Sequence, residues 1–167
     1  MPPRIAYTPQ VPHLFSESLG DNILLGSEGD LDEAVRLAVL DDDLLDMPDG
    51  LATAIGSRGV RLSGGQVQRT AAARMLVRDA ELLVCDDLSS ALDVETETAL
   101  WARVLGDRRQ TVLAVSHRRA ALQRADQIVV LQAGRIADVG SLPELLGRCD
   151  DGTQPGCRCA DPGSGDA

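Results

Sequence analysis

The chain has 167 residues, and its 26 acidic and 16 basic side chains give a formal net charge of −10. This length suits a single domain, and a hydrophobic share of 44% is enough for a packed core. The acidic balance excludes a protein that binds nucleic acid through a basic face. No apolar run reaches the ~18 residues of a membrane-spanning helix, and the chain does not begin like a signal peptide. We therefore expect a soluble cytosolic domain that reaches a membrane only through a partner.

Apolar spacing predicts alternating helices and strands along the chain. The first helical pattern begins at Asp30, where Asp30 and Glu33 are spaced as a capping pair. The predicted helices are 30–46, 67–77 and 94–105. Short continuous apolar runs predict strands that are buried on both faces. The predicted strands are 82–85, 111–115 and 128–131.

The end of the chain contains a predicted hairpin and a short helix. Residues 136–139 return after the last strand, and Ser141 and Glu144 form a capping box for the closing helix. Strands that alternate with helices favour an α/β fold with a mainly parallel sheet. After Gly147 the composition changes to small and polar residues, which predicts a disordered tail over 148–167.

Four cysteines divide between the predicted core and the tail. Cys85 lies in an apolar run and is expected to be a small core residue. Cys149, Cys157 and Cys159 lie in the tail. Their spacing fits no standard zinc pattern and no histidine is near, so free thiols are expected and a metal site is the alternative.

Residues 62–66 form the first candidate site. Ser63 is placed to cap a helix whose first turn contains Gly64 and Gly65, with Gln66 at the fourth position of the capping box. Each glycine weakens that helix by about 1 kcal/mol relative to alanine, which makes sense if a ligand approaches the backbone. The Ser63 hydroxyl and the two glycine amides are therefore candidate phosphate ligands at a helix N-terminus. An ordinary capped helix is the alternative.

The second and third candidate sites follow two predicted strands. Asp86 and Asp87 come at the end of the first strand, and His117 comes just past the second. Because open α/β sheets bind ligands at the carboxyl ends of their strands, Asp86 is a candidate Mg²⁺ ligand. Asp87 is a candidate to orient or deprotonate a water, and His117 to donate to a phosphate oxygen. The alternatives are a capping pair of aspartates and a surface histidine.

Five motifs in chain order resemble the nucleotide-binding domain of ATP-binding cassette (ABC) proteins, from about residue 4 to 147. They are Gln10, 63–66, 86–87, 90–93 and His117. The most specific one, at 62–69, reads LSGGQVQR and looks like the family signature motif. The resemblance implies a partial P-loop NTPase-like parallel sheet with an inserted α-helical subdomain. That subdomain would cover about 20–80, followed by a Walker B to switch-histidine segment at 81–117 and C-terminal strands at 127–140.

The resemblance also implies roles for these residues. Gln10 is similar to the Q-loop glutamine, which reaches Mg²⁺ and senses the γ-phosphate of ATP. Asp86 matches the Walker B aspartate, a metal ligand. Asp87 takes the place of the catalytic base, and His117 matches the catalytic switch histidine. Asp93 belongs to the D-loop, which crosses a dimer interface beside the bound nucleotide.

The expected partners follow from the same resemblance. In this family the signature turn of one subunit faces the ATP held by the other, so a second nucleotide-binding domain is expected. The resemblance implies that Ser63, Gly64, Gly65 and Gln66 contact the nucleotide of that neighbour. Residues 12–26 are similar to the segment that contacts the transmembrane domain, and their sequence is closest to the exporter-like branch. This implies a location at the cytoplasmic face of the cell membrane.

The sequence departs from the family pattern at several positions. Asp87 stands where glutamate is usual, so its carboxylate retracts by ~1.5 Å on an unchanged backbone. Leu88 replaces the usual proline, and Ser57 stands where an acidic residue is common in exporters. All 16 basic residues are arginine, so the chain contains no lysine for a Walker A motif.

We therefore expect the chain to be the C-terminal part of an ABC ATPase domain, inactive alone. A truncated gene or gene model would explain this, and so would a split domain completed by another polypeptide. The predicted function is ATP binding and hydrolysis coupled to transport. The alternatives are a fragment of a non-transport ABC ATPase, which the acidic charge and residues 14–16 disfavour, and a remnant without catalysis.

Overall fold

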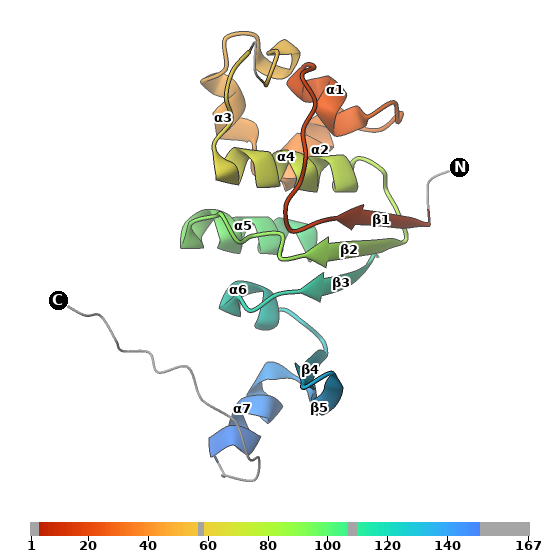
Figure 1. The fold of residues 1–167 in the computed structure, drawn as a ribbon, viewed down its shortest axis with the longest axis vertical. Helices are drawn as coiled ribbons and strands as arrows, with labels where there is room; N and C mark the ends of the chain where they lie inside the picture. Colours follow the sequence, from red (N-terminus) through yellow and green to blue (C-terminus); the bar gives the residue numbers. More distant parts are fainter. Residues whose placement is uncertain (1–3, 57–58, 107–109, 151–167) are drawn as a thin grey trace, which may run out of the picture. The chain divides into compact units, whose positions relative to one another are not determined.

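The structure is a computed structural model that describes residues 4–56, 59–106 and 110–150. The chain divides into two compact units at residues 121 and 122, and each unit is described by itself (Figure 1). No helix among the described residues is long and apolar enough to cross a membrane. Most of the predicted tail, with Cys157 and Cys159, lies outside the described residues.

The first unit contains a three-stranded parallel sheet in the order β1-β2-β3. The strands are β1 (Ile5–Thr8), β2 (Leu82–Asp86) and β3 (Thr111–Val115). Two of them confirm the predicted strands, and β1 adds one that the apolar pattern did not predict. Leu83 in the middle of the sheet pairs with Ala6 on one side and Val112 on the other. All three strands therefore end at the same edge of the sheet.

One face of this sheet is covered by helices. Ala6, Leu83 and Cys85 are buried, and the Thr8 hydroxyl donates to the carbonyl oxygen of Ala71 in a covering helix at 3.4 Å. Helices α4 (Gly64–Leu76) and α5 (Val94–Val104) both contribute buried apolar side chains to the core. Burial raises the pKa of the Cys85 thiol to about 12, because the charged thiolate is disfavoured away from water. Cys85 is thus the core residue that the sequence predicts.

The other face of the sheet is open within the described residues. Ile5, Tyr7, Leu113 and Val115 are 58 to 62% exposed and alternate with the buried positions, so they share this face. The prediction that β3 is buried on both faces is therefore wrong for this structure. The physical reason is that β3 ends the strand order and no described element of this unit packs over this side.

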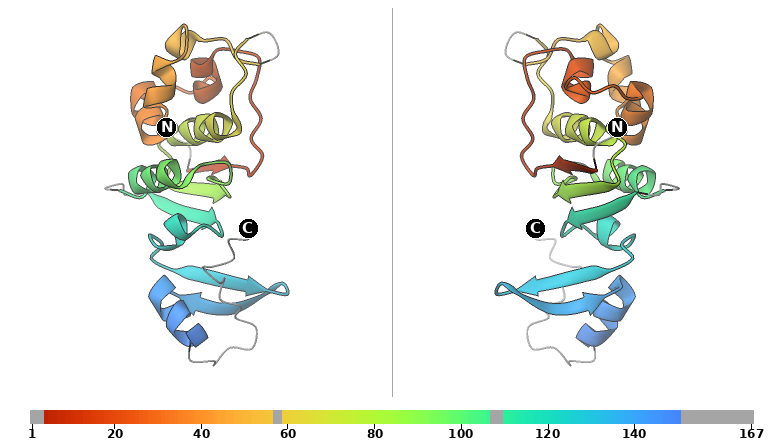
Figure 2. Two further views of the ribbon diagram at one scale, coloured as in Figure 1. Left: turned by 90° about the vertical axis from the view of Figure 1, so that its left-hand side faces the viewer. Right: turned by 90° about the vertical axis from the view of Figure 1, so that its right-hand side faces the viewer.

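Short helices precede α4 in the chain. They are α1 (Leu19–Leu24), α2 (Leu31–Leu37), α3 (Asp41–Leu45) and the 3₁₀ turn η1 (Gly50–Ala52). Both views of Figure 2 show α4 next to β1 and the shorter helices on the far side of α4. The single helix predicted over 30–46 is wrong, because the chain breaks at Val39, where φ is +59°. The Asp30 cap is confirmed, since its carboxylate accepts from the Glu33 amide at 2.9 Å.

Helix α5 confirms the prediction for 94–105 to within one residue. Its Trp101 is buried, and the Trp101 indole donates to the Ser89 hydroxyl at 3.3 Å. The Ser89 hydroxyl donates in turn to buried Glu97 at 2.6 Å. This buried network fixes α5 against the loop that follows β2. A further short helix, α6 (Arg119–Leu122), lies where the two units meet in the sequence.

The second unit is an antiparallel hairpin followed by a helix. Its elements are β4 (Ile128–Gln132), β5 (Arg135–Gly140) and α7 (Leu142–Asp150). Ala133 and Gly134 turn the chain with positive φ angles of 49° and 75°, as a tight hairpin requires. The predicted hairpin is confirmed, and the Ser141 amide donates to Glu144 at 2.8 Å at the start of α7. The predicted burial of 128–131 is wrong, because this strand has one partner and its side chains are largely exposed.

Candidate functional site

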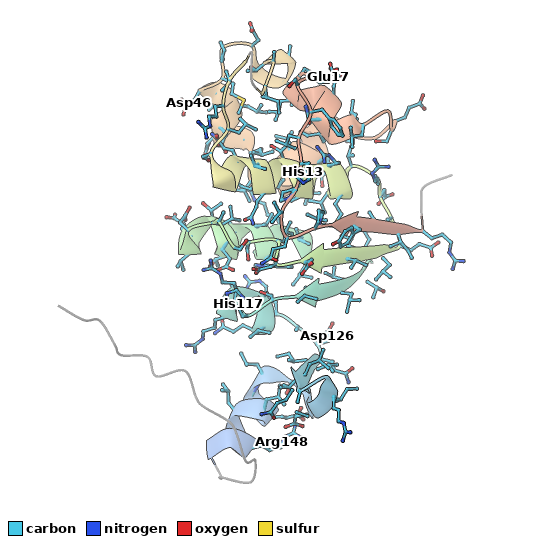
Figure 3. The ribbon with its side chains drawn as sticks, in the orientation of Figure 1. His13, Glu17, Asp46, His117, Asp126 and Arg148 are labelled. Carbon is cyan, nitrogen blue, oxygen red and sulfur yellow. The ribbon has the colours of Figure 1, made fainter. Side chains whose placement is uncertain are left out.

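Four predicted site residues come together at the carboxyl edge of the parallel sheet. Gln10 follows β1, Asp86 ends β2, Asp87 comes directly after it, and His117 lies two residues beyond β3. Figure 3 shows His117 beyond the arrowhead of β3. Since the strands are parallel and in register, three chain segments far apart in sequence present polar groups at one edge.

Asp87 is the centre of this group. The side-chain amide of Gln10 donates to one carboxylate oxygen of Asp87 at 3.4 Å. The Nδ1 atom of His117 lies 3.8 Å from the other oxygen, which forms an ion pair when the imidazole is protonated. The Asp87 side chain is 9% exposed and that of His117 is 76% exposed. The site therefore has a buried carboxylate under a histidine that faces solvent.

The backbone of Asp87 is held in an uncommon conformation. Its φ is +49°, a region that residues other than glycine seldom adopt, and its amide donates to the carbonyl oxygen of Val115 at 2.9 Å. The Oδ1 oxygen of Asp87 is buried and has no hydrogen-bond partner. Leaving a buried acceptor unsatisfied costs about 1–3 kcal/mol. Local backbone strain and a buried oxygen without a hydrogen bond are features that cluster at functional sites.

Asp86 and Gln10 are the residues that the sequence predicts to bind Mg²⁺. Within the described residues, no cluster of three or more histidine, cysteine or carboxylate side chains could hold a metal ion. Mg²⁺ is commonly bound by one or two protein carboxylates, with phosphate and water oxygens completing its six ligands. The half-buried Asp86 carboxylate and the Gln10 amide oxygen fit that partial set.

The signature turn, residues 63–66, confirms the predicted capping box. The Gln66 amide donates to the Ser63 hydroxyl at 3.2 Å, and the Ser63 amide donates to the Gln66 side-chain oxygen at 2.8 Å. The geometry of a helix leaves the amides of Gly64 and Gly65 without an intrahelical acceptor. Ser63 and Gly64 are exposed, so an anion has free access to this helix N-terminus.

The loop between β2 and α5 contacts both the start of α4 and the segment that carries His117. A methyl group on Gly65 would lie 3.3 Å from the carbonyl oxygen of Ala91, so the two segments are in close contact. Gln68 in α4 donates to the Ser90 hydroxyl at 2.5 Å and accepts from the Ala91 amide at 2.8 Å. Arg118 donates to the Ser90 carbonyl oxygen at 2.8 Å from the other side.

Sequence reasoning missed Gln68 and Arg118. Gln68 is a buried polar residue on the inner side of an amphipathic helix, which is a usable signal because buried amides need partners. Arg118 directly follows the candidate histidine, and nothing in its local pattern distinguishes it from a surface arginine. Asp93 caps α5 and accepts from the Thr96 amide at 2.9 Å. Hydrogen bonds from Thr96 lower the pKa of Asp93.

An apolar groove of about 510 Å³ is lined in part by Leu62 and Val67, on either side of the signature turn. Its apolar lining includes Leu14, Phe15, Ile55, Val60 and Leu62. Two of these residues belong to the segment predicted to contact a transmembrane domain. Position 57, where the sequence lacks the usual acidic residue, lies outside the described residues.

Comparisons with known proteins agree with this architecture. The family model described as ABC transporter matches residues 1–90. The chain is 42% identical over 149 residues to the heterocyst differentiation ATP-binding protein HepA of Nostoc, which aligns with 86% of this chain and 24% of that protein. It is 40% identical over 147 residues to the probable multidrug resistance ABC transporter ATP-binding/permease protein YheI of Bacillus subtilis, with 85% and 25% covered.

A solved structure shows the same fold. A bacterial Atm1-family ABC exporter with ATP bound aligns with a TM-score of 0.79 and 34% identity, over 87% of this chain and 26% of that one. The chain thus spans about a tenth to a quarter of the length of the curated relatives it matches. The α/β fold with a parallel sheet and the resemblance inferred from the motifs are confirmed. The chain belongs to the ABC transporter family, and its fold is similar to that of part of an exporter.

Proposed function

We propose that this chain is part of the ATP-binding domain of an exporter-like ABC transporter, in which ATP binding and hydrolysis drive transport across a membrane. The observation that carries the proposal is the meeting of Gln10, Asp87 and His117 at one sheet edge. Three separate segments bring an amide, a buried carboxylate and an imidazole together there. An aspartate that only caps the turn after β2 would need neither the amide of Gln10 nor the imidazole of His117 beside it.

Each group has a role suited to its position. Asp86 and Gln10 would hold Mg²⁺, whose charge would stabilise the phosphate oxygens of ATP. Asp87 orients the attacking water and accepts its proton through Oδ1, which makes no hydrogen bond among the described residues. His117 is exposed and placed to donate to the γ-phosphate as negative charge develops. Because Asp87 is one methylene shorter than glutamate, we expect slow turnover.

The open face of the sheet supports a second part of the proposal. Parallel sheets are normally covered on both faces, yet Ile5, Tyr7, Leu113 and Val115 are exposed. The chain also has no lysine to bind the β- and γ-phosphates. We propose that a further part of the ATP-binding domain packs over this face and carries the lysine-bearing phosphate loop. The chain alone then lacks ATPase activity.

Two partners complete the working unit. The apolar groove beside Leu14 and Phe15 accepts a helix of the transmembrane domain, which holds the protein at the cytoplasmic face of the membrane. A second ATP-binding domain presents its own nucleotide to the signature turn. The free amides of Gly64 and Gly65 and the Ser63 hydroxyl then contact the γ-phosphate of that nucleotide.

The test is phosphate release by this chain fused to the lysine-bearing part of an ABC ATPase domain, with ATP-driven dimerisation measured in parallel. Asp87→Asn should abolish turnover and leave dimerisation intact, and His117→Ala should lower turnover. Asp42→Asn, an exposed aspartate in α3, is the matched control. Turnover by Asp87→Asn at the rate of the unsubstituted fusion would exclude Asp87 as the base. Dimerisation without any turnover in the unsubstituted fusion would favour a binding-only remnant.

A further inference from the structure

The carboxylate of Asp43 in α3 binds two side chains of the signature helix α4. It accepts from the Gln66 side-chain amide at 2.9 Å. It also forms a two-pronged ion pair with Arg69, at 2.5 and 3.1 Å. The side chains of Asp43 and Arg69 are only 15% and 14% exposed, so water screens this pair weakly. Arg69 extends the link by donating to the carbonyl oxygen of Val39, where α2 and α3 are separated.

The side chain of Gln66 is engaged at both ends. Its oxygen accepts from the Ser63 amide at 2.8 Å, and its nitrogen donates to Asp43. The Asp43 bond thereby selects the orientation of the amide plane in which the oxygen faces Ser63. With the opposite orientation, the amide nitrogen would face the Ser63 amide, and two donors would meet.

We infer that Asp43 is a positioning residue for the signature turn, and that Gln66 acts through this link and does not itself bind the nucleotide. This inference rests on the proposed function, because it assumes that the turn meets a phosphate. The groups left for the anion are the Ser63 hydroxyl and the amides of Gly64 and Gly65. Asp43 keeps the Ser63 amide bonded to Gln66, so the hydroxyl and the glycine amides keep one fixed arrangement.

Exchange of donor and acceptor provides a sharp test. Gln66→Glu keeps an oxygen for the Ser63 amide but places a carboxylate against the carboxylate of Asp43. The double variant Asp43→Asn with Gln66→Glu restores a donor–acceptor pair with the roles reversed, and the introduced glutamate offers Arg69 a carboxylate. If Gln66 positions the turn, the double variant should recover the behaviour of the unsubstituted chain. If Gln66 instead contacts phosphate, the double variant should not recover it, because the introduced carboxylate repels an anion whether residue 43 is aspartate or asparagine.

The measurement uses the ¹⁵N-labelled full chain by NMR, without and with millimolar MgATP. Without ATP, Gln66→Glu should speed exchange of the Ser63 amide proton by roughly tenfold, and the double variant should return it near the original rate. With MgATP, the Gly64 and Gly65 amide shifts should be lost in the single variant and recovered in the double one. Asp42→Asn is the control on the same helix and should change neither readout.

The outcomes separate the inference from the proposed function. If Gln66→Glu leaves Ser63 exchange unchanged, or the double variant fails to restore it while remaining folded by Trp101 fluorescence, Asp43 does not position the turn. If the unsubstituted chain shows no MgATP-dependent shift at Gly64 and Gly65, the turn of the chain alone does not bind free nucleotide. The exchange rate of the Ser63 amide proton, measured without ATP, still decides whether Asp43 positions the turn.

Discussion

The two faces of the sheet should respond very differently to the same substitution. Leu83 points to the covered face and is fully buried, whereas Leu113 on the neighbouring strand points to the open face and is 58% exposed. Full burial of a leucine side chain contributes about 1.5–3 kcal/mol. With roughly two fifths of its surface covered, Leu113 contributes about 1 kcal/mol. Leu83→Ala also leaves a cavity and should cost about 2–5 kcal/mol.

Urea unfolding of the full chain measures both costs. Trp101 is the single tryptophan and is buried against Ser89, so its fluorescence reports the core without labels. We expect Leu83→Ala to lower the free energy of unfolding by about 1–4 kcal/mol more than Leu113→Ala. Leu45→Ala, at an 84% exposed leucine, is the control and should change stability by less than ~0.5 kcal/mol.

Two results would refute this reasoning. An equal cost for Leu113→Ala and Leu83→Ala at every protein concentration would mean that the face is covered by the chain itself. A cost for Leu113→Ala that falls on dilution would mean that a second copy covers the face. In either case the open face would not be available to the rest of an ATP-binding domain.

Further predictions concern single residues. Because hydrogen bonds from Thr96 lower the pKa of Asp93, the ionised Asp93 cap stabilises the fold at pH values above the ordinary pKa of 3.8. This stabilisation is lost as the pH falls through the lowered pKa of the folded state. In thermal melts recorded at a series of pH values, Asp93→Asn should remove the part of the acid destabilisation that comes from this cap. Gln68→Ala should cost about 1–3 kcal/mol and speed hydrogen exchange at the Ala91 amide, whereas unchanged exchange would show that the loop is fixed elsewhere. Cys85, with a pKa of about 12, should be alkylated at pH 8 only on unfolding, as read by peptide mass spectrometry.

Local patterns predicted those parts of the fold whose cause is local. The Ser63 cap follows from side chains within four residues, and the strands at 82–85 and 111–115 follow from apolar runs between polar segments. The carboxyl-end rule placed Asp87 and His117 at the same edge of the sheet. The contact of Gln10 with Asp87 depends on the pairing of β1 with β2, and the apolar pattern did not predict β1 at all.

The remaining features depend on contacts between distant segments. The break at Val39 runs against the helical spacing of 30–46, and its carbonyl oxygen accepts from Arg69 thirty residues later. The pairing of Asp43 with Arg69 has the same origin, since three consecutive aspartates give no local sign of which one faces α4. The exposure of β3 reflects what packs over it, which the composition of the strand cannot specify.

The open face and the polar edge are linked by the direction of β3. Val115 ends this strand on the open face, and His117 follows two residues later, a separation of roughly 7 Å along an extended chain. A polypeptide that buries Val115 therefore comes next to His117 and to the Asp87 carboxylate beneath it. Ile5 lies on the same face but at the opposite end of the parallel strands. Packing at Ile5 can contribute only affinity, whereas packing at Val115 also brings the added segment to the atoms that would meet the phosphate.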